Sequence, residues 1–312
     1  MFEDKYIELE KLKRKGLIGA VLIVIEILLI FVVLPIVIEL IPELADKATD
    51  SPLISIICFF AMALIVGITF KILCVPYINF EGKLEDEVKE NILKNEMNNA
   101  FNSSYREEDK ESFKMILDEL DVFTSTRYIN DYFSIKYQNV RVKYADLDIS
   151  SRDSEGDTTT HFRGQVLEFN LNNNIDYTLY VTMKEKVLFG NIYMIDSYVH
   201  KKNNKVIVPT NNILKEDLVF KSNANPTIIE DTAFQEIINN LINDKEYSLI
   251  FNKDKLYVFI NNYNDFFEIK VKDKQEELNS EEKIRAQING LKEEIDKILN
   301  YKERLNIKED SF

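Results

Sequence analysis

Two long apolar runs decide the architecture: GLIGAVLIVIEILLIFVVLPIVIELI at residues 16–41 and PLISIICFFAMALIVGITFKILCV at residues 52–75. A hydrocarbon core about 30 Å thick is crossed by about 20 helical residues, and each run supplies that length. A secretory signal peptide has one short apolar stretch before a small-residue cleavage site, so the pair favours membrane spans at about 17–41 and 53–75. We therefore expect a transmembrane helical hairpin over residues 16–76.

Charges beside these runs predict the orientation. Four basic residues lie at 11–15, immediately before the first run, whereas the connector 42–51 carries only Lys47. Because basic residues are retained on the cytoplasmic side, the segment 1–15 is expected in the cytoplasm. Two crossings return the chain to that side, so we expect a multi-pass protein of a bacterial cell membrane with both termini cytoplasmic. The bacterial assignment rests on abundant Asn, Lys and Ile and on the absence of Trp, a composition typical of AT-rich genomes.

Polar and small residues inside the runs raise two hypotheses. Glu26 lies near mid-membrane by helical rise, where a carboxyl group is costly and often functional. It is interpreted either as a protonated group bonded to a neighbouring helix or as the lumen-facing residue of an oligomeric channel or transporter. Ala63 and Gly67 are four residues apart, a spacing that lets helix backbones approach closely, within the hairpin or between copies.

Composition excludes several classes of function. The formal net charge is −14, which is opposite to the charge of a surface that binds a phosphate backbone, so no nucleic-acid partner is expected. Cys58 and Cys74 are the only cysteines and provide neither a disulfide framework nor a thiolate metal site. His161 and His200 lack metal-ligand spacing, and no glycine-rich phosphate loop is present. We expect no cofactor, no metal and no catalytic residue.

Residues 77–272 predict a cytoplasmic α+β domain. Apolar residues first recur at helical spacing, and from Tyr132 the period changes to two, which predicts antiparallel strands. Helices, then strands, a helix and strands favour α+β over an alternating parallel sheet. The expected elements are helices at about 84–101 and 104–123, strands at 140–144, 162–169, 177–181, 187–195, 206–208 and 218–220, a helix at 232–242, and a hairpin of 248–251 with 256–260.

Residues 273–312 predict an amphipathic C-terminal helix with a tail. Apolar residues alternate at spacings of four and three over about three heptads, a pattern typical of a coiled coil. Such a helix either pairs with a second copy or packs on its own chain, and three heptads are near the lower limit for a stable coiled coil. The residues expected in this helix association are Ile284, Ile288, Leu291, Ile295 and Ile298.

The element Phe162-Arg163-Gly164, followed by Phe169-Asn170-Leu171-Asn172, resembles an uncharacterised bacterial membrane protein family, domain-of-unknown-function (DUF) family 3137. The likeness extends to the strands 140–148 and 218–222 and to Ala233-Phe234. This resemblance implies two membrane helices before a cytoplasmic domain, and it assigns no activity. Independently of it, a glycine within a strand predicts a bulge or a close approach of two backbones at Gly164.

These patterns favour a non-enzymatic, membrane-anchored module whose cytoplasmic domain recognises a protein partner or a lipid headgroup at the inner membrane face. Headgroup recognition is predicted to use Arg141, Lys143 and Arg163, of which alternation along a strand places only the first two on one face. The rival hypothesis is an enzyme that acts on a membrane-associated substrate through an acidic turn cluster. That cluster comprises Asp146, Asp148, Asp153, Glu155 and Asp157.

Overall fold

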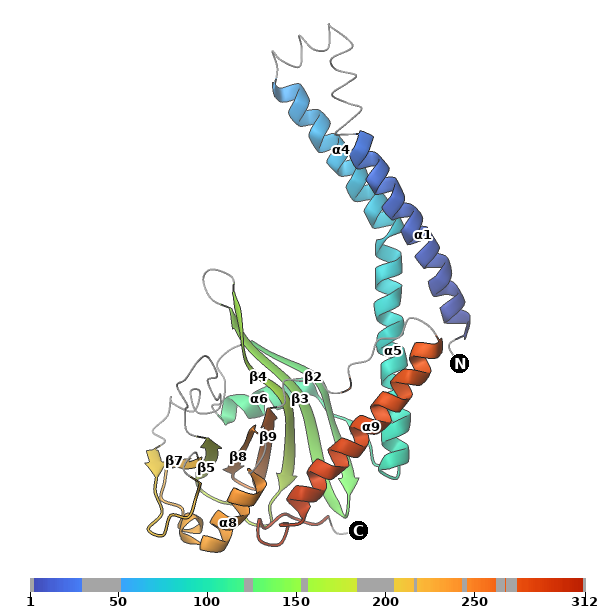
Figure 1. Ribbon diagram of the computed structural model, residues 1–312. Helices are drawn as coiled ribbons and strands as arrows, with labels where there is room; N and C mark the ends of the chain where they lie inside the picture. The colour runs from blue at the N-terminus through green and yellow to red at the C-terminus, as the bar shows by residue number, and fades with distance from the viewer. Residues whose placement is uncertain are drawn as a thin grey trace, which may run out of the picture. The chain divides into compact units, whose positions relative to one another are not determined.

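The computed structural model, shown in Figure 1, describes two compact units. The first comprises 1–92 with 269–282, and the second comprises 93–268 with 283–312. The division falls inside two helices, α5 (Val75–Ala100) and α9 (Lys274–Leu299). The residues that the structure describes are 3–29, 52–120, 126–152, 157–183, 205–215, 218–242, 246–261, 267 and 274–310.

In the first unit, α1 (Glu3–Leu28) packs antiparallel against α4 (Pro52–Leu73), as Figure 1 shows. Gly19 of α1 lies against Leu73, and Glu26, nearly two turns further along α1, lies against Thr69. Residue numbers thus rise along α1 while those of its contacts on α4 fall, so the two helices are antiparallel. Among the side chains that the structure describes on these helices, most of the large apolar ones face outward. Those more than 40% exposed include Leu17, Ile18, Val21, Val24, Ile25, Leu28, Phe60, Leu64, Ile65, Ile68, Phe70 and Ile72.

One helix among the described residues, Ala63–Ala100, contains a stretch that is long and apolar enough to cross a membrane, judged by length and composition. The final part of the first expected span and the connector fall within residues 30–51, which lie outside the described residues. The described residues thus contain one spanning candidate and the packing of α1 on α4, and the expected hairpin of two spans stays a prediction.

The segment before the first apolar run is the start of α1, and it packs on other helices of the same unit. Leu9 is buried, as are Leu84 and Val88 of α5. The Tyr6 hydroxyl donates to Glu277 of α9 at 3.0 Å. α5 begins nine residues earlier than the expected start at 84, because Pro76 lies in its first turn, where a missing N–H breaks no helical hydrogen bond.

The second unit is built on one sheet of nine antiparallel strands, which confirms the α+β class and the antiparallel sheet predicted from the sequence. The strand order is β1-β2-β3-β4-β9-β8-β5-β7-β6. The strands are β1 (Arg106–Glu107), β2 (Thr126–Tyr137), β3 (Val140–Arg152), β4 (Thr158–Asn170), β5 (Thr178–Met183), β6 (Lys205–Ile207), β7 (Leu218–Ser222), β8 (Glu246–Asn252) and β9 (Lys255–Asn261). The strand expected at 187–195 and the tip of the turn at 153–156 lie outside the described residues.

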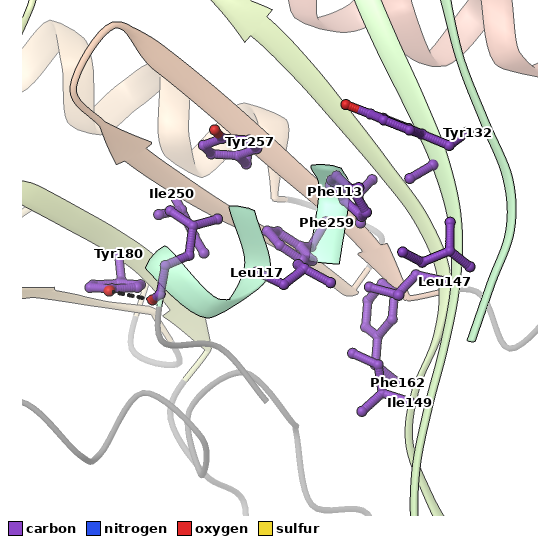
Figure 2. Packing of buried hydrophobic residues seen from close by; sticks show 14 residues of the cluster. Phe113, Leu117, Tyr132, Leu147, Ile149, Phe162, Tyr180, Ile250, Tyr257 and Phe259 are labelled. Carbon is purple, nitrogen blue, oxygen red and sulfur yellow. Dashed lines mark hydrogen bonds between the residues drawn. The ribbon is translucent and has the colours of Figure 1, made fainter. Parts of the chain in front are cut away.

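The helix expected over 104–123 is shorter in the structure. α6 runs from Lys110 to Glu119, because the Asp109 side chain accepts a hydrogen bond from the Glu111 backbone N–H and caps the helix there. Arg106 and Glu107 form the edge strand β1 instead. α6 covers one face of the sheet through Phe113 and Leu117, which join the buried cluster drawn in Figure 2.

The other face of the sheet is covered by α8 (Thr232–Leu241) and by the part of α9 that belongs to this unit, as Figure 1 shows. Phe234 of α8 stacks on Phe220 and meets Phe251 edge to face. A short 3-10 helix, η3 (Thr227–Glu230), precedes α8. The two covering layers leave the sheet buried on both faces over most of its area.

Gly164 lies where β4 approaches β9 closely, which confirms the close backbone approach predicted for a glycine in this strand. A Cβ atom at this position would lie 2.0 Å from the Ile260 carbonyl oxygen. No L-residue with a side chain fits that space without displacing the backbone of β9. The glycine therefore permits the pairing of Gly164 with Asn261.

Candidate functional site

The three cations predicted to contact a lipid headgroup lie on two faces of the sheet. Arg141 and Lys143 share one face of β3, whereas Arg163 pairs across from Asp148 on the opposite face. Each cation has an acidic partner: Arg141 lies 3.0 Å from Glu108, and Arg163 lies 2.7 Å from Asp148. Partner carboxylates already neutralise much of the positive charge that an anionic headgroup would meet.

Lys143 belongs to a cluster around a buried carboxylate. Glu168 is 3% exposed, and its Oε1 lies 3.6 Å from the Lys143 Nζ and 3.2 Å from the Lys255 Nζ. Lys143 also donates to the Tyr132 hydroxyl at 3.4 Å. Burial raises the pKa of Tyr132 and of Tyr257, and the nearby Glu168 charge raises both further. This arrangement holds a buried negative charge between two ammonium groups.

The acidic turn residues do not converge within the described part of the chain. Asp146 is buried on the sheet, and Asp148 is engaged by Arg163. Asp153 and Glu155 lie outside the described residues. Across the described ranges, no group of three His, Cys, Asp or Glu side chains has the arrangement of a metal site.

In the first unit, Glu26 accepts a hydrogen bond from the Thr69 hydroxyl at 2.9 Å. Gly67 faces open space, with no atom within 4 Å of a Cβ built on it, and Ala63 is also exposed. The close contact between α1 and α4 is formed instead by Gly19, whose Cβ would lie 2.6 Å from that of Leu73. The predicted small pair therefore lies outside the seam between these two helices.

The apolar stripe predicted for the C-terminal helix lies inside the second unit. Its five residues are at most 2% exposed within a single chain. α9 ends at Leu299, and the chain continues in turns that include Lys302 and Leu305. The members of the stripe are Ile284, Ile288, Leu291, Ile295 and Ile298.

A groove in the second unit lies between α8 and the turns that follow α9, and we call it the α8–α9 groove. Asp231 caps α8, and the apolar side of that helix packs on the sheet, which leaves its polar side along one wall of the groove. Its volume is about 560 Å³. The lining residues are Ala233, Glu236, Ile237, Asn240, Leu299, Asn300, Tyr301, Lys302, Glu303 and Arg304.

A smaller cavity of about 140 Å³ adjoins the groove, and the two share Asn240, Asn300 and Tyr301. We call it the inner cavity. Besides those shared residues, four aliphatic side chains line it together with Tyr247 and Lys297. The aliphatic residues are Leu241, Leu249, Val258 and Ile298.

A buried polar pair lies at the inner cavity. The Tyr247 hydroxyl donates to Glu294, and the Lys297 Nζ lies 3.4 Å from the other oxygen of that carboxylate. Burial raises the pKa of Tyr247, and the contact with Glu294 raises it further. The groove thus combines a polar rim, an inner cavity with one aliphatic wall and a hydrogen-bonded pair, which is the composition of many small-ligand sites.

Sequence reasoning did not identify the α8–α9 groove. Its walls come from residues 233–240 and 299–304, which are far apart in the chain, and its polar residues resemble ordinary helix-end and turn residues. The change from heptad spacing to polar residues after Leu299 is the one signal that marks the end of α9. Only the packing of that end beside α8 creates the groove.

Comparisons with known proteins give little further identification. No family model matches the chain, and no curated protein does. The resemblance to family 3137 therefore stays a prediction. One similar solved structure is the crystal structure of the mycobacterial trehalose monomycolate transport factor A, TtfA, with a TM-score of 0.34 and 9% sequence identity. The alignment covers 63% of this chain and 94% of that chain.

Proposed function

We propose that this protein is a membrane-anchored interaction module, held by a two-span hairpin, whose α+β domain recognises a protein partner at the inner face of a bacterial membrane. The observation that carries the proposal is the outward exposure of apolar side chains along both α1 and α4. Two packed helices that are apolar on their outer surface are stable in lipid, whereas the same surface in water exceeds the apolar patch of an ordinary soluble monomer.

The orientation follows from charge. Lys11, Lys13, Arg14 and Lys15 precede the first apolar run, and the connector carries only Lys47. Basic residues near the ends of membrane helices stay in the cytoplasm, so both termini and the α+β domain are cytoplasmic in this proposal.

A protein partner is favoured over a lipid headgroup because of how the surface cations are used. Arg141, Lys143 and Arg163 each face a carboxylate of this chain, and they are divided between two faces of the sheet. An anionic headgroup would have to displace those carboxylates, while a headgroup site ordinarily gathers free basic residues on one surface.

The anchoring is tested on the full chain in a Cys58→Ser, Cys74→Ser background. Single cysteines are placed by Lys13→Cys, Asp46→Cys or Asp310→Cys, and intact cells are treated with a membrane-impermeant maleimide. We expect labelling of Asp46→Cys alone, and the protein should remain in the membrane fraction after an alkaline carbonate wash. Release by carbonate, or labelling of Asp310→Cys before the cells are opened, would contradict the proposal.

The choice of partner is tested in lipid nanodiscs. Hydrogen exchange of β3 in the full chain is compared in neutral and anionic nanodiscs at low and high salt. We expect equal protection of β3 in both lipids. If β3 were protected in anionic nanodiscs in a salt-sensitive way, and the Arg141→Gln/Lys143→Gln variant lost that protection, the ligand would be a lipid headgroup and not a protein.

A further inference from the structure

The inner cavity is suited to a small aliphatic group. Leu241, Leu249, Val258 and Ile298 give it an aliphatic wall, and the one charged side chain in its lining, Lys297, is paired with Glu294. Its volume of about 140 Å³ corresponds to roughly four or five water molecules in the liquid. Burying aliphatic carbon in such a space contributes about 0.8 kcal/mol for each CH₂ removed from water. A ligand with one aliphatic side chain therefore gains affinity here.

The rim of the α8–α9 groove carries exposed charges of both signs; one of them, Glu303, lies near the ammonium group of Lys302 and raises the pKa of that group. Glu236 lies on the α8 wall and Arg304 on the wall formed by the turns after α9. Both are exposed, and within the described residues neither side chain has a hydrogen-bond or ion-pair partner. The lysines are occupied, since Lys302 pairs with Glu309 and Lys297 with Glu294.

Two amide side chains complete the rim. Asn240 projects from α8 and Asn300 from the end of α9, and both line the groove and the inner cavity. An amide offers both donors and an acceptor, which is the complement of a peptide group. Asn240 and Asn300 therefore lie between the inner cavity and the exposed charges of Glu236 and Arg304.

From these features we propose that the α8–α9 groove binds a short zwitterionic peptide. The carboxylate of the peptide pairs with Arg304, its ammonium group pairs with Glu236, and an aliphatic side chain enters the inner cavity. Asn240 and Asn300 bind the peptide group between them. A volume of about 560 Å³ lies within the range of about 300–1,000 Å³ that is usual for small-ligand sites. This binding activity is separate from membrane anchoring and from recognition of a protein partner.

The test uses the full chain in nanodiscs and measures binding of the dipeptide Leu-Leu by calorimetry. Three related compounds separate the contributions: Gly-Gly lacks aliphatic side chains, N-acetyl-Leu-Leu lacks the ammonium group, and Leu-Leu amide lacks the carboxylate. We expect saturable binding of Leu-Leu and at least tenfold weaker binding of each of the other three. N-acetyl-Leu-Leu also imitates the carboxyl terminus of a protein, so it distinguishes a free peptide from a protein end.

Variants test the assigned residues. Arg304→Gln should weaken Leu-Leu binding at least tenfold and remove the difference between Leu-Leu and its amide. Glu236→Gln should weaken binding similarly and remove the difference between Leu-Leu and its acetylated form. Lys308→Gln and Glu293→Gln change exposed charges of the same sign outside the groove and should bind as the unmodified chain does. Circular dichroism and thermal melting confirm that each variant is folded.

Several results would overturn the proposal. Absence of saturable Leu-Leu binding to the folded chain would do so, as would equal affinity for N-acetyl-Leu-Leu and Leu-Leu. Arg304→Gln and Glu236→Gln that behave like their controls would also refute it. None of these outcomes affects the labelling pattern that tests anchoring, so the two proposals fail independently.

Discussion

The Thr69 hydroxyl of α4 donates to the Glu26 carboxyl group of α1 at 2.9 Å, where the apolar stretches of the two helices lie side by side. In an apolar surrounding, hydrogen bonds between helices contribute about 0.6–2 kcal/mol. We predict that a double-mutant cycle of Glu26→Leu and Thr69→Val, measured by unfolding in mixed micelles, gives a coupling energy in that range. Additive effects of the two substitutions would show that the contact does not hold the helices together.

Glu26→Gln separates this structural role from the channel hypothesis. The Gln side chain keeps a carbonyl oxygen that accepts from Thr69, so stability and membrane insertion should change little. If Glu26 instead lined the lumen of an oligomeric channel, the same substitution would abolish ion or proton flux in proteoliposomes. We expect no flux from the unmodified chain and none from the variant.

Gly19 and Gly67 provide a matched pair in the same two helices. A Cβ on Gly19 would lie 2.6 Å from the Leu73 Cβ, whereas a Cβ on Gly67 meets nothing within 4 Å. We predict that Gly19→Ala destabilises the chain in mixed micelles by about 1–3 kcal/mol, the usual cost of overpacking. Gly67→Ala should be neutral or slightly stabilising. Equal effects would contradict the assigned seam between α1 and α4.

Gly164→Ala should be among the most damaging single substitutions in the second unit. The added methyl group would lie 2.0 Å from the Ile260 carbonyl oxygen, so β4 and β9 must separate. We expect a loss of about 2–4 kcal/mol in the free energy of unfolding, or failure to fold. Gly82→Ala serves as the control, because nothing lies within 4 Å of its Cβ position. A urea titration of both variants makes the comparison.

The antiparallel sheet was predictable because its strands carry period-two patterns, as in Val140, Val142 and Tyr144, which all point to one face. Gly164 was predictable for a related reason, since a strand glycine signals close backbone approach. Helix ends were less predictable. The start of α6 at Lys110 depends on capping by Asp109, and the start of α5 at Val75 depends on Pro76 being tolerated in a first turn.

The candidate site was largely beyond sequence reasoning, for a physical reason. Strand spacing places Lys143 on a face, but only the register of β3, β4 and β9 brings Glu168 and Lys255 to it. The heptad pattern from Ile284 to Ile298 is compatible with dimerisation or with packing against the rest of the same chain. The structure places these residues in the core of the second unit. Residues 236 and 304 line one groove from distant parts of the chain, an arrangement that leaves no local pattern in the sequence.

The cluster around Glu168 predicts strongly non-additive substitutions. Lys143→Met leaves Lys255 at 3.2 Å from the carboxylate, and Lys255→Met leaves Lys143 at 3.6 Å. Each single variant should lose about 1 kcal/mol or less of unfolding free energy. The double variant leaves the buried Glu168 without a positive partner and should lose about 3–5 kcal/mol. Restoration of stability by adding Glu168→Gln to the double variant would confirm the cause. An additive double variant would contradict it.

Tyr247 predicts a pH dependence in the alkaline range. Its pKa in the folded chain is raised above the ordinary value of 10.0 by burial and by Glu294, so the folded state retains the hydroxyl proton when the unfolded state has released it. The stabilisation is complete below about pH 10 and is lost as pH rises from there, with a slope of up to about 1.4 kcal/mol per pH unit.

Denaturant unfolding tests this with Tyr247→Phe. Above pH 10, the free energy of unfolding should fall less steeply with pH in this variant than in the unmodified chain. At neutral pH the variant should lose about 1–3 kcal/mol, because Glu294 no longer receives the tyrosine hydrogen bond. Identical slopes for the two chains would show that Tyr247 ionises as readily in the folded state as in the unfolded state.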